Sequence, residues 1–103
     1  MINIIGITED NKLEADIKIK DLQLSSYKWC WVDFNEPTEE EMKHLGETFH
    51  FHPLAIEDCI QRLQRPKLDY YEDHTFYVTH IVREQENEIV KDELDFFVGE
   101  NFI

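Results

Sequence analysis

Residues 49–67 have the sequence Phe-His-Phe-His-Pro-Leu-Ala-Ile-Glu-Asp-Cys-Ile-Gln-Arg-Leu-Gln-Arg-Pro-Lys, and two prolines bound its central part. Pro53 stands where a helix can begin, because the first helical residue needs no N–H donor. Pro66 prevents a helix from continuing. The side chains between them that share one predicted face are apolar: Ile56, Cys59, Ile60 and Leu63. Those predicted to point away from this core face are polar: Glu57, Asp58, Gln61 and Arg62. The stretch therefore predicts a short amphipathic helix.

A second helix is predicted immediately upstream. Pro37 ends an apolar run, and Thr38 and Glu41 have the Thr-x-x-Glu spacing of a capping box. Three apolar residues then recur at helical spacing as one buried stripe: Met42, Leu45 and Phe49. The acids at 39–41 suit the positive end of the helix dipole, so we interpret them as helix-start residues rather than metal ligands.

Strand patterns lie on both sides of these helices. On the N-terminal side they cover residues 2–7, 13–19 and 28–34. The last of these is apolar on both faces, which favours a central strand. On the C-terminal side they cover 68–71, 76–83 and 89–98, with a further strand beginning at 102–103. The predicted fold is α/β: one domain over residues 1–103, with a mixed β-sheet and flanking helices. The approximate order is β-β-β-α-α-β-β-β, and the sheet is cut off at its C-terminus.

Charge excludes several partners. The chain has 23 acidic and 10 basic residues and a formal net charge of −13. Nucleic-acid binding needs a cationic surface, so this chain is not expected to bind DNA or RNA, and anionic lipid would also be repelled. Cations would be attracted, although acidic charge also serves solubility alone. No apolar run is long enough to span a bilayer, and no signal peptide is apparent.

Catalytic patterns are weak. The glycines are scattered rather than grouped in a phosphate-binding loop, and no serine lies in a nucleophile-elbow pattern, so an enzyme is not expected. The three nearby histidines could ligate zinc, but their spacing matches no helical or finger pattern: His44, His50 and His52. We interpret them as surface or capping residues. Cys30 and Cys59 are expected to be buried free thiols.

The adjacent acids Glu57 and Asp58 are the stronger metal candidates. Carboxylates on an exposed helix face suit Mg²⁺, which keeps most of its waters and takes one or two direct carboxylates. The alternative is an ordinary Asp58–Arg62 pair on a solvated helix face.

Three motifs resemble one family. Trp31-Val32-Asp33, then His52-Pro53-Leu54-x-x-Glu57-Asp58, then Gln64-Arg65-Pro66-Lys67 are similar to the cytoplasmic domain of the CorA divalent-cation transporters, over about residues 27–103. The resemblance implies a pentameric channel for Mg²⁺ and sometimes Co²⁺. It also implies that the stalk and membrane helices lie beyond this chain. This chain would then be the N-terminal cytoplasmic regulatory domain at the cytoplasmic face of the membrane, touching the membrane only through the missing part.

The resemblance also implies roles for particular residues. Glu57 and Asp58 correspond to acids of a regulatory divalent-cation site between subunits, with Asp58 the stronger candidate. The site would hold Mg²⁺ or Co²⁺ weakly, and only in the full-length homopentamer. The remaining motif residues are expected to be structural: Trp31, Asp33, His52, Pro53, Gln64, Arg65, Pro66 and Lys67. An acidic protein-interaction module without a metal role, and a zinc-transporting member of the family, remain alternatives.

Overall fold

The structure is a computed structural model that describes residues 1–61 and 65–103. The chain divides into two compact units, Met1–His50 with Gly99–Ile103, and Phe51–Val98. Within the described residues the strands form two three-stranded sheets, one in each unit. The prediction of one mixed sheet is therefore wrong. Sequence periodicity shows which residues form strands, but not which strands pair with one another.

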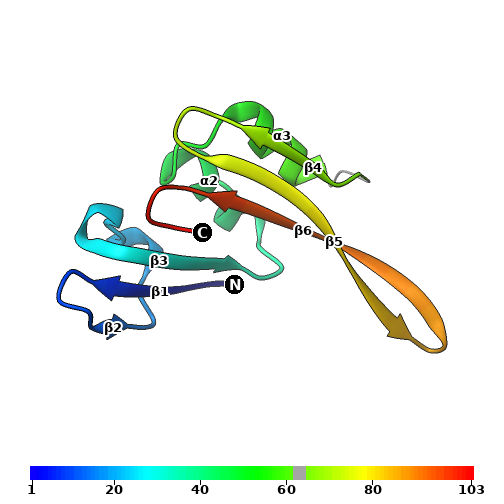
Figure 1. Cartoon of the computed structure of the whole chain (residues 1–103), viewed down its shortest axis with the longest axis horizontal. Coiled ribbons are helices and arrows are strands. Elements are labelled where there is room, and N and C mark those ends of the chain that lie inside the picture. Colours follow the sequence, from blue (N-terminus) through cyan, green and yellow to red (C-terminus); the bar gives the residue numbers. More distant parts are fainter. Residues whose placement is uncertain (62–64) are drawn as a thin grey trace. The chain divides into compact units, whose positions relative to one another are not determined.

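The first sheet has β1 (Ile2–Thr8) between β2 (Leu13–Glu14) and β3 (Tyr27–Phe34), with both pairings antiparallel (Figure 1). The predicted strand over 13–19 is wrong beyond Glu14. Asp16 has a φ of 56°, and this left-handed conformation takes the chain out of the sheet. Two short 3₁₀ helices follow, η1 (Ile19–Asp21) and η2 (Leu24–Ser26).

The second edge of β3 is paired with the end of the chain. Cys30 N–H donates to the Asn101 carbonyl at 2.8 Å, and Val32 N–H donates to the Ile103 carbonyl at 2.9 Å. Phe102 forms a parallel bridge with Cys30, so this sheet is mixed and β3 is central, as predicted. Gly99 makes the turn possible, because a Cβ there would lie 2.0 Å from the Phe102 ring.

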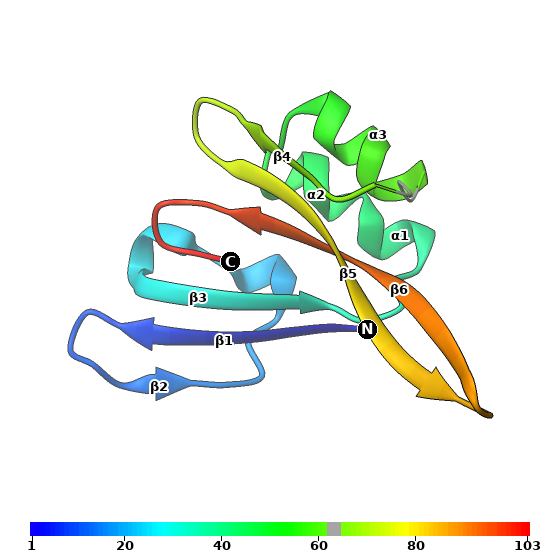
Figure 2. The same cartoon turned by 45° about the vertical axis from the view of Figure 1, so that its right-hand side comes forward.

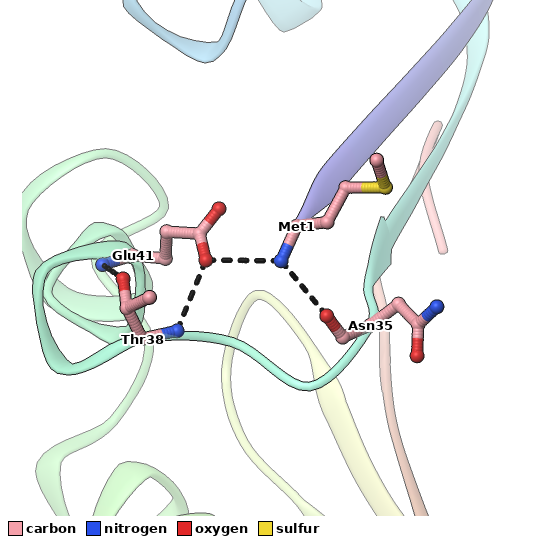
Figure 3. Close-up of polar contacts among 4 residues, drawn as sticks. All are labelled: Met1, Asn35, Thr38 and Glu41. Carbon is pink, nitrogen blue, oxygen red and sulfur yellow. Dashed lines mark hydrogen bonds and ion pairs between the residues drawn. The ribbon is translucent and has the colours of Figure 1, made fainter.

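Helix formation in the first unit follows the predicted cap. Thr38 Oγ1 accepts from Glu41 N–H at 3.1 Å, and Glu41 Oε1 accepts from Thr38 N–H at 3.0 Å (Figure 3). The same Glu41 oxygen lies 3.0 Å from the Met1 ammonium. The single predicted helix is instead two, α1 (Glu39–Met42) and α2 (His44–Glu47). Lys43 between them keeps helical dihedrals, so only the hydrogen bonding is interrupted.

The second unit contains α3 (Pro53–Gln61), β4 (Lys67–Tyr70), β5 (Thr75–Gln85) and β6 (Glu88–Val98). Its antiparallel strands lie in the order β4-β5-β6, and Figure 2 shows β5 and β6 as one long twisted hairpin. The start of α3 at Pro53 confirms the prediction.

The core of the second unit is built on Ala55, Phe76 and Val78, each 0% exposed. The partly buried residues packed against it are Cys59, Tyr71 and Phe97. The predicted core face of α3 is partly wrong, since Ile60 is 58% exposed while Ala55 is buried. The helix has apolar residues on adjoining faces, and the small Ala55 allows the closest approach to the sheet.

Candidate functional site

Two histidine rings, those of His52 and His74, accept hydrogen bonds from backbone N–H groups at the start of α3. The buried His74 accepts a hydrogen bond from His52 N–H at Nε2, 3.3 Å away, and its Nδ1 lies 2.6 Å from Asp73 Oδ1. This network assigns the ring proton to Nδ1, because Nε2 acts as an acceptor. His52 Nδ1 accepts from Leu54 N–H at 3.1 Å, and its ring stacks on Tyr71 with a centroid distance of 4.4 Å. His52 therefore lies where a helix-start residue was expected.

His74 is the residue of this helix start that the sequence did not indicate. It lies in the turn between β4 and β5, just before the strand, and it continues by one step the alternation of the buried Phe76 and Val78. Its ring is in contact with aromatic residues of this unit, with centroids 4.9 Å from Phe51 and 5.1 Å from Tyr71. Burial of His74 is a consequence of this tertiary packing.

Glu57 lies where the helix pattern predicted it. Its side chain is exposed and accepts a hydrogen bond from Gln61 Nε2 at 3.2 Å, one helical turn further along. This pair is a surface contact of the kind that adds a few tenths of a kcal/mol, about 0.2–0.5 kcal/mol, to a helix.

Asp58 does not lie on a solvated face, and this prediction is wrong. Its side chain is 24% exposed, and its Oδ2 accepts a hydrogen bond from the ammonium of Lys67. Lys67 Nζ also lies 2.6 Å from Asp69 Oδ2. We call these three residues, Asp58, Lys67 and Asp69, the acid–lysine cluster. The alternative Asp58–Arg62 pair and the motif residue Gln64 lie outside the described residues.

Strand alternation explains how the cluster forms. Lys67 and Asp69 occupy alternate positions of β4, opposite the buried Val78 and Phe76 of β5. Side chains two residues apart in a strand share one face, and this is the face that α3 covers. Asp58 stands three residues after the buried Ala55, so helical spacing brings its carboxylate to the same face. The Lys67 ammonium lies 5.6 Å from the centroid of the Phe76 ring.

The electrostatics of the cluster keep the lysine charged. The hydrogen bond that the Lys67 ammonium donates to Asp58, followed by the one it donates to Asp69, raises the pKa of Lys67 above its usual range. Burial raises the pKa of the nearby Tyr71 hydroxyl, and the negative charge of Asp69 adds to this shift. Two carboxylates and one ammonium leave the cluster with a net negative charge.

The chemistry of the cluster suits a hard cation in part. Carboxylate oxygens are the ligands that Mg²⁺ prefers, and two of them converge on the Lys67 nitrogen. Among residues 1–61 and 65–103, however, no group of three or more His, Cys, Asp or Glu side chains could hold a metal ion.

The remaining candidates have other surroundings. His44 Nδ1 lies 2.6 Å from Thr48 Oγ1, and His50 is exposed with a φ of 55°. Trp31 and Asp33 are exposed on β3, opposite Ile5 and Asn3 of β1.

The motif prolines and arginine lie on either side of the described part of α3. Pro53 is the first residue of that helix, and Arg65 and Pro66 are exposed between the end of the described helix and β4. Within the part of the chain that the structure describes, no helix is long and apolar enough to cross a membrane.

Comparison with known proteins agrees with the motifs. Residues 26–103 match the family model described as CorA-like Mg2+ transporter protein. The putative metal ion transporter YfjQ of Bacillus subtilis is 46% identical over 103 residues, which is 100% of this chain and 32% of that protein. The cobalt/magnesium transport protein CorA of Thermotoga maritima is 28% identical over 64 residues, 60% of this chain and 18% of that protein.

Solved structures show the same fold. The soluble domain of CorA from Methanocaldococcus jannaschii has a TM-score of 0.67 at 20% identity, covering 99% of this chain and 38% of that one. The complete CorA magnesium transporter from the same organism has a TM-score of 0.68 at 15% identity, covering 99% of this chain and 30% of that one. The chain spans 32% of the length of its curated relative YfjQ. With the family model matching most of its residues and its motifs in place, this chain belongs to the CorA-like Mg2+ transporter family.

Proposed function

We propose that this chain is the ion-sensing regulatory domain of a CorA-like divalent-cation transporter and that Asp58, with Glu57, contributes carboxylates to a regulatory cation site. Its place would be the cytoplasmic face of the membrane, within a homopentamer of full-length subunits. The observation that supports the proposal is the contact of the Asp58 carboxylate with a cationic group, the Lys67 ammonium, within the residues that match the family model.

Magnesium and cobalt are the cations that the relatives suggest. The Thermotoga relative is named for cobalt and magnesium transport, and a yeast relative, 34% identical over 50 residues, is named a magnesium transporter. The carboxylate oxygens of this chain are hard ligands, which is the chemistry that Mg²⁺ requires. Because Mg²⁺ takes only one or two direct carboxylates, we expect water and a neighbouring subunit to supply the remaining ligands.

Charge supplies the mechanism of regulation. Subunits that carry a net charge of −13 on this segment repel one another across any shared interface. Divalent ions bound between subunits offset that repulsion and favour a closed, symmetric assembly. When the cytosolic ion concentration falls, the ions leave, repulsion returns and the population shifts toward the open channel.

The test is a Mg²⁺ titration of the full-length transporter in lipid, following channel activity for the wild type, Asp58→Ala and Glu72→Ala. Glu72 is an exposed acid of the same unit, so its variant removes an equal charge elsewhere. We expect Asp58→Ala to need clearly more Mg²⁺ to close, and Glu72→Ala to behave as the wild type. Identical closure of the Asp58 variant and the wild type would refute the sensing role.

A further inference from the structure

The Lys67 ammonium lies at a point where two carboxylates of the same chain come together. Its nitrogen contacts one oxygen of each of two carboxylates, Asp58 Oδ2 on α3 and Asp69 Oδ2 on β4. Both oxygens lie within hydrogen-bond reach of the same atom, so they converge on one point. The cation at this point is the Lys67 ammonium, a side chain of the same protein.

The surroundings of this point also favour positive charge. Lys67 is the first residue of β4, and its side chain is 29% exposed on the inner face of the sheet. The ammonium lies 5.6 Å from the Phe76 ring centroid, and the face of an aromatic ring attracts a cation. Phe76 is itself fully buried, so this face of the ring stays in place beside the ammonium.

We propose that Lys67 is a tethered competitor for divalent cations at Asp58. This inference rests on the proposed function for the role of Asp58 and adds a regulator to it. A divalent ion that takes the Asp58 Oδ2 oxygen must displace the Lys67 ammonium from it, and an ion bound at the other carboxylate oxygen would lie beside that positive charge. The affinity of the ion for Asp58 is therefore reduced by the stability of the ion pair that it replaces. Lys67 then raises the Mg²⁺ concentration at which Asp58 becomes occupied.

The second carboxylate makes the exchange possible without stranding a charge. Asp69 lies 2.6 Å from Lys67 Nζ, so the ammonium can keep this partner when Asp58 passes to the ion. An unpaired, partly buried ammonium would otherwise oppose the exchange. The ion pair with Asp69 therefore keeps the Lys67 ammonium close to Asp58 after a divalent ion has displaced it.

The inference is tested by direct binding to the 103-residue chain. Backbone amide NMR signals of Asp58 and Asp69 are followed during titration with MgCl₂, with NaCl at matched ionic strength as the reference. The variants are Lys67→Met, which keeps most of the length of the side chain without its charge, and Lys67→Arg, which keeps the charge. The double variant Lys67→Met/Asp58→Asn reports whether any gain depends on Asp58.

We expect Lys67→Met to reach half-saturation at a Mg²⁺ concentration about tenfold or more below that needed by the wild type. This is the change in affinity that corresponds to the loss of one hydrogen bond to a charged group. Lys67→Arg should bind as the wild type does, and the double variant should lose the gain. Lys67→Gln keeps an N–H donor for Asp58 and replaces Lys67→Met if the methionine variant does not fold.

Equal Mg²⁺ binding by the folded uncharged variant and the wild type would overturn the inference, as would a gain that persists without the Asp58 carboxylate. The two proposals fail separately. If Asp58→Ala and the wild type close at the same Mg²⁺ concentration, the sensing role is refuted, while the competition between Lys67 and Mg²⁺ for Asp58 is not. A missing gain in Lys67→Met refutes the competition and leaves the channel result standing.

Discussion

At the scale of single residues, the first unit contains a tyrosine–carboxylate pair whose ionisation can be measured. Tyr27 Oη donates to Glu14 Oε2 at 2.6 Å, and its ring packs against Gly6, where a Cβ would lie 2.6 Å from Tyr27 Cδ1. The hydrogen bond to Glu14, followed by burial, raises the pKa of Tyr27 to about 12. The phenol is therefore held neutral beside a negative charge.

This pair predicts a loss of stability at alkaline pH. Because the folded pKa of Tyr27 lies above its ordinary value of 10.0, the contribution of the pair is complete below that value and is lost as pH rises toward about 12. In Glu14→Gln the pKa of Tyr27 should fall toward its ordinary value. An absorbance titration of the four tyrosines measures this, with Tyr70→Phe as a control at an exposed site. An unchanged titration in Glu14→Gln would contradict the assigned cause.

At the residue scale, the ion pair of Asp58 with Lys67 is a contact that the sequence patterns did not indicate. Lys67 was expected to be a structural motif residue, and Asp58 was expected to point away from the core. Spacing along the helix and strand alternation each place these side chains on a face, but neither shows that the two faces meet. The ion pair depends on how α3 lies on the sheet, which is a property of the packed core of Ala55, Phe76 and Val78.

At the scale of elements, the pairing of β3 with the last residues of the chain depends on one side chain. Asn101 Nδ2 donates to the carbonyl of Leu24 at 2.8 Å and to that of Tyr27 at 3.1 Å. This amide connects the C-terminal segment to η2 and to the start of β3. The backbone bonds of Cys30 with Asn101 and Ile103 then complete the edge of the sheet.

Asn101→Ala should therefore destabilise the chain. Two partly buried carbonyls would lose their donor, which costs about 1–3 kcal/mol in free energy of unfolding. Glu100→Ala changes an exposed neighbour and should stay within about 0.5 kcal/mol of the wild type. Urea unfolding of both variants measures the difference. Equal stability of the two variants would show that the amide does not secure the segment.

At the scale of the whole molecule, the charge and the cluster together determine how the chain responds to ions. With 23 acidic and 10 basic residues, the folded chain is destabilised by its own repulsion, which any salt screens. Asp58, the carboxylate for which we propose cation binding, is already paired with Lys67. A general salt effect should therefore dominate over a specific one in the wild-type chain.

We expect NaCl to raise the melting temperature of the chain, and MgCl₂ to produce no submillimolar, Asp58-dependent rise. Thermal unfolding is measured for the wild type and Asp58→Ala in NaCl and in MgCl₂ at matched ionic strength. The increment produced by Mg²⁺ over Na⁺ should be the same in both proteins. A submillimolar increment that is present only in the wild type would mean that one chain completes the site without a partner.

The sequence by itself determined the features whose causes are local. The capping box of Thr38 and Glu41, the helix start at Pro53, the hairpin of β5 and β6, and the family motifs all depend on chemistry between residues close in the chain. The charge excess likewise predicts that the chain does not bind nucleic acid, and this stays a prediction. The position of Asp16 shows the limit of such signals, because a left-handed residue ended a strand that the alternation extended.

Three features follow from tertiary packing: the division of the strands into two sheets, the burial of His74, and the ion pair of Asp58 with Lys67. Each depends on which faces pack together, and packing is chosen by the fit of whole side chains rather than by the periodicity of one segment. Asp58 has the same place in the helical pattern whether it faces water or a lysine. Its environment was set by the approach of α3 to β4, which no local pattern records.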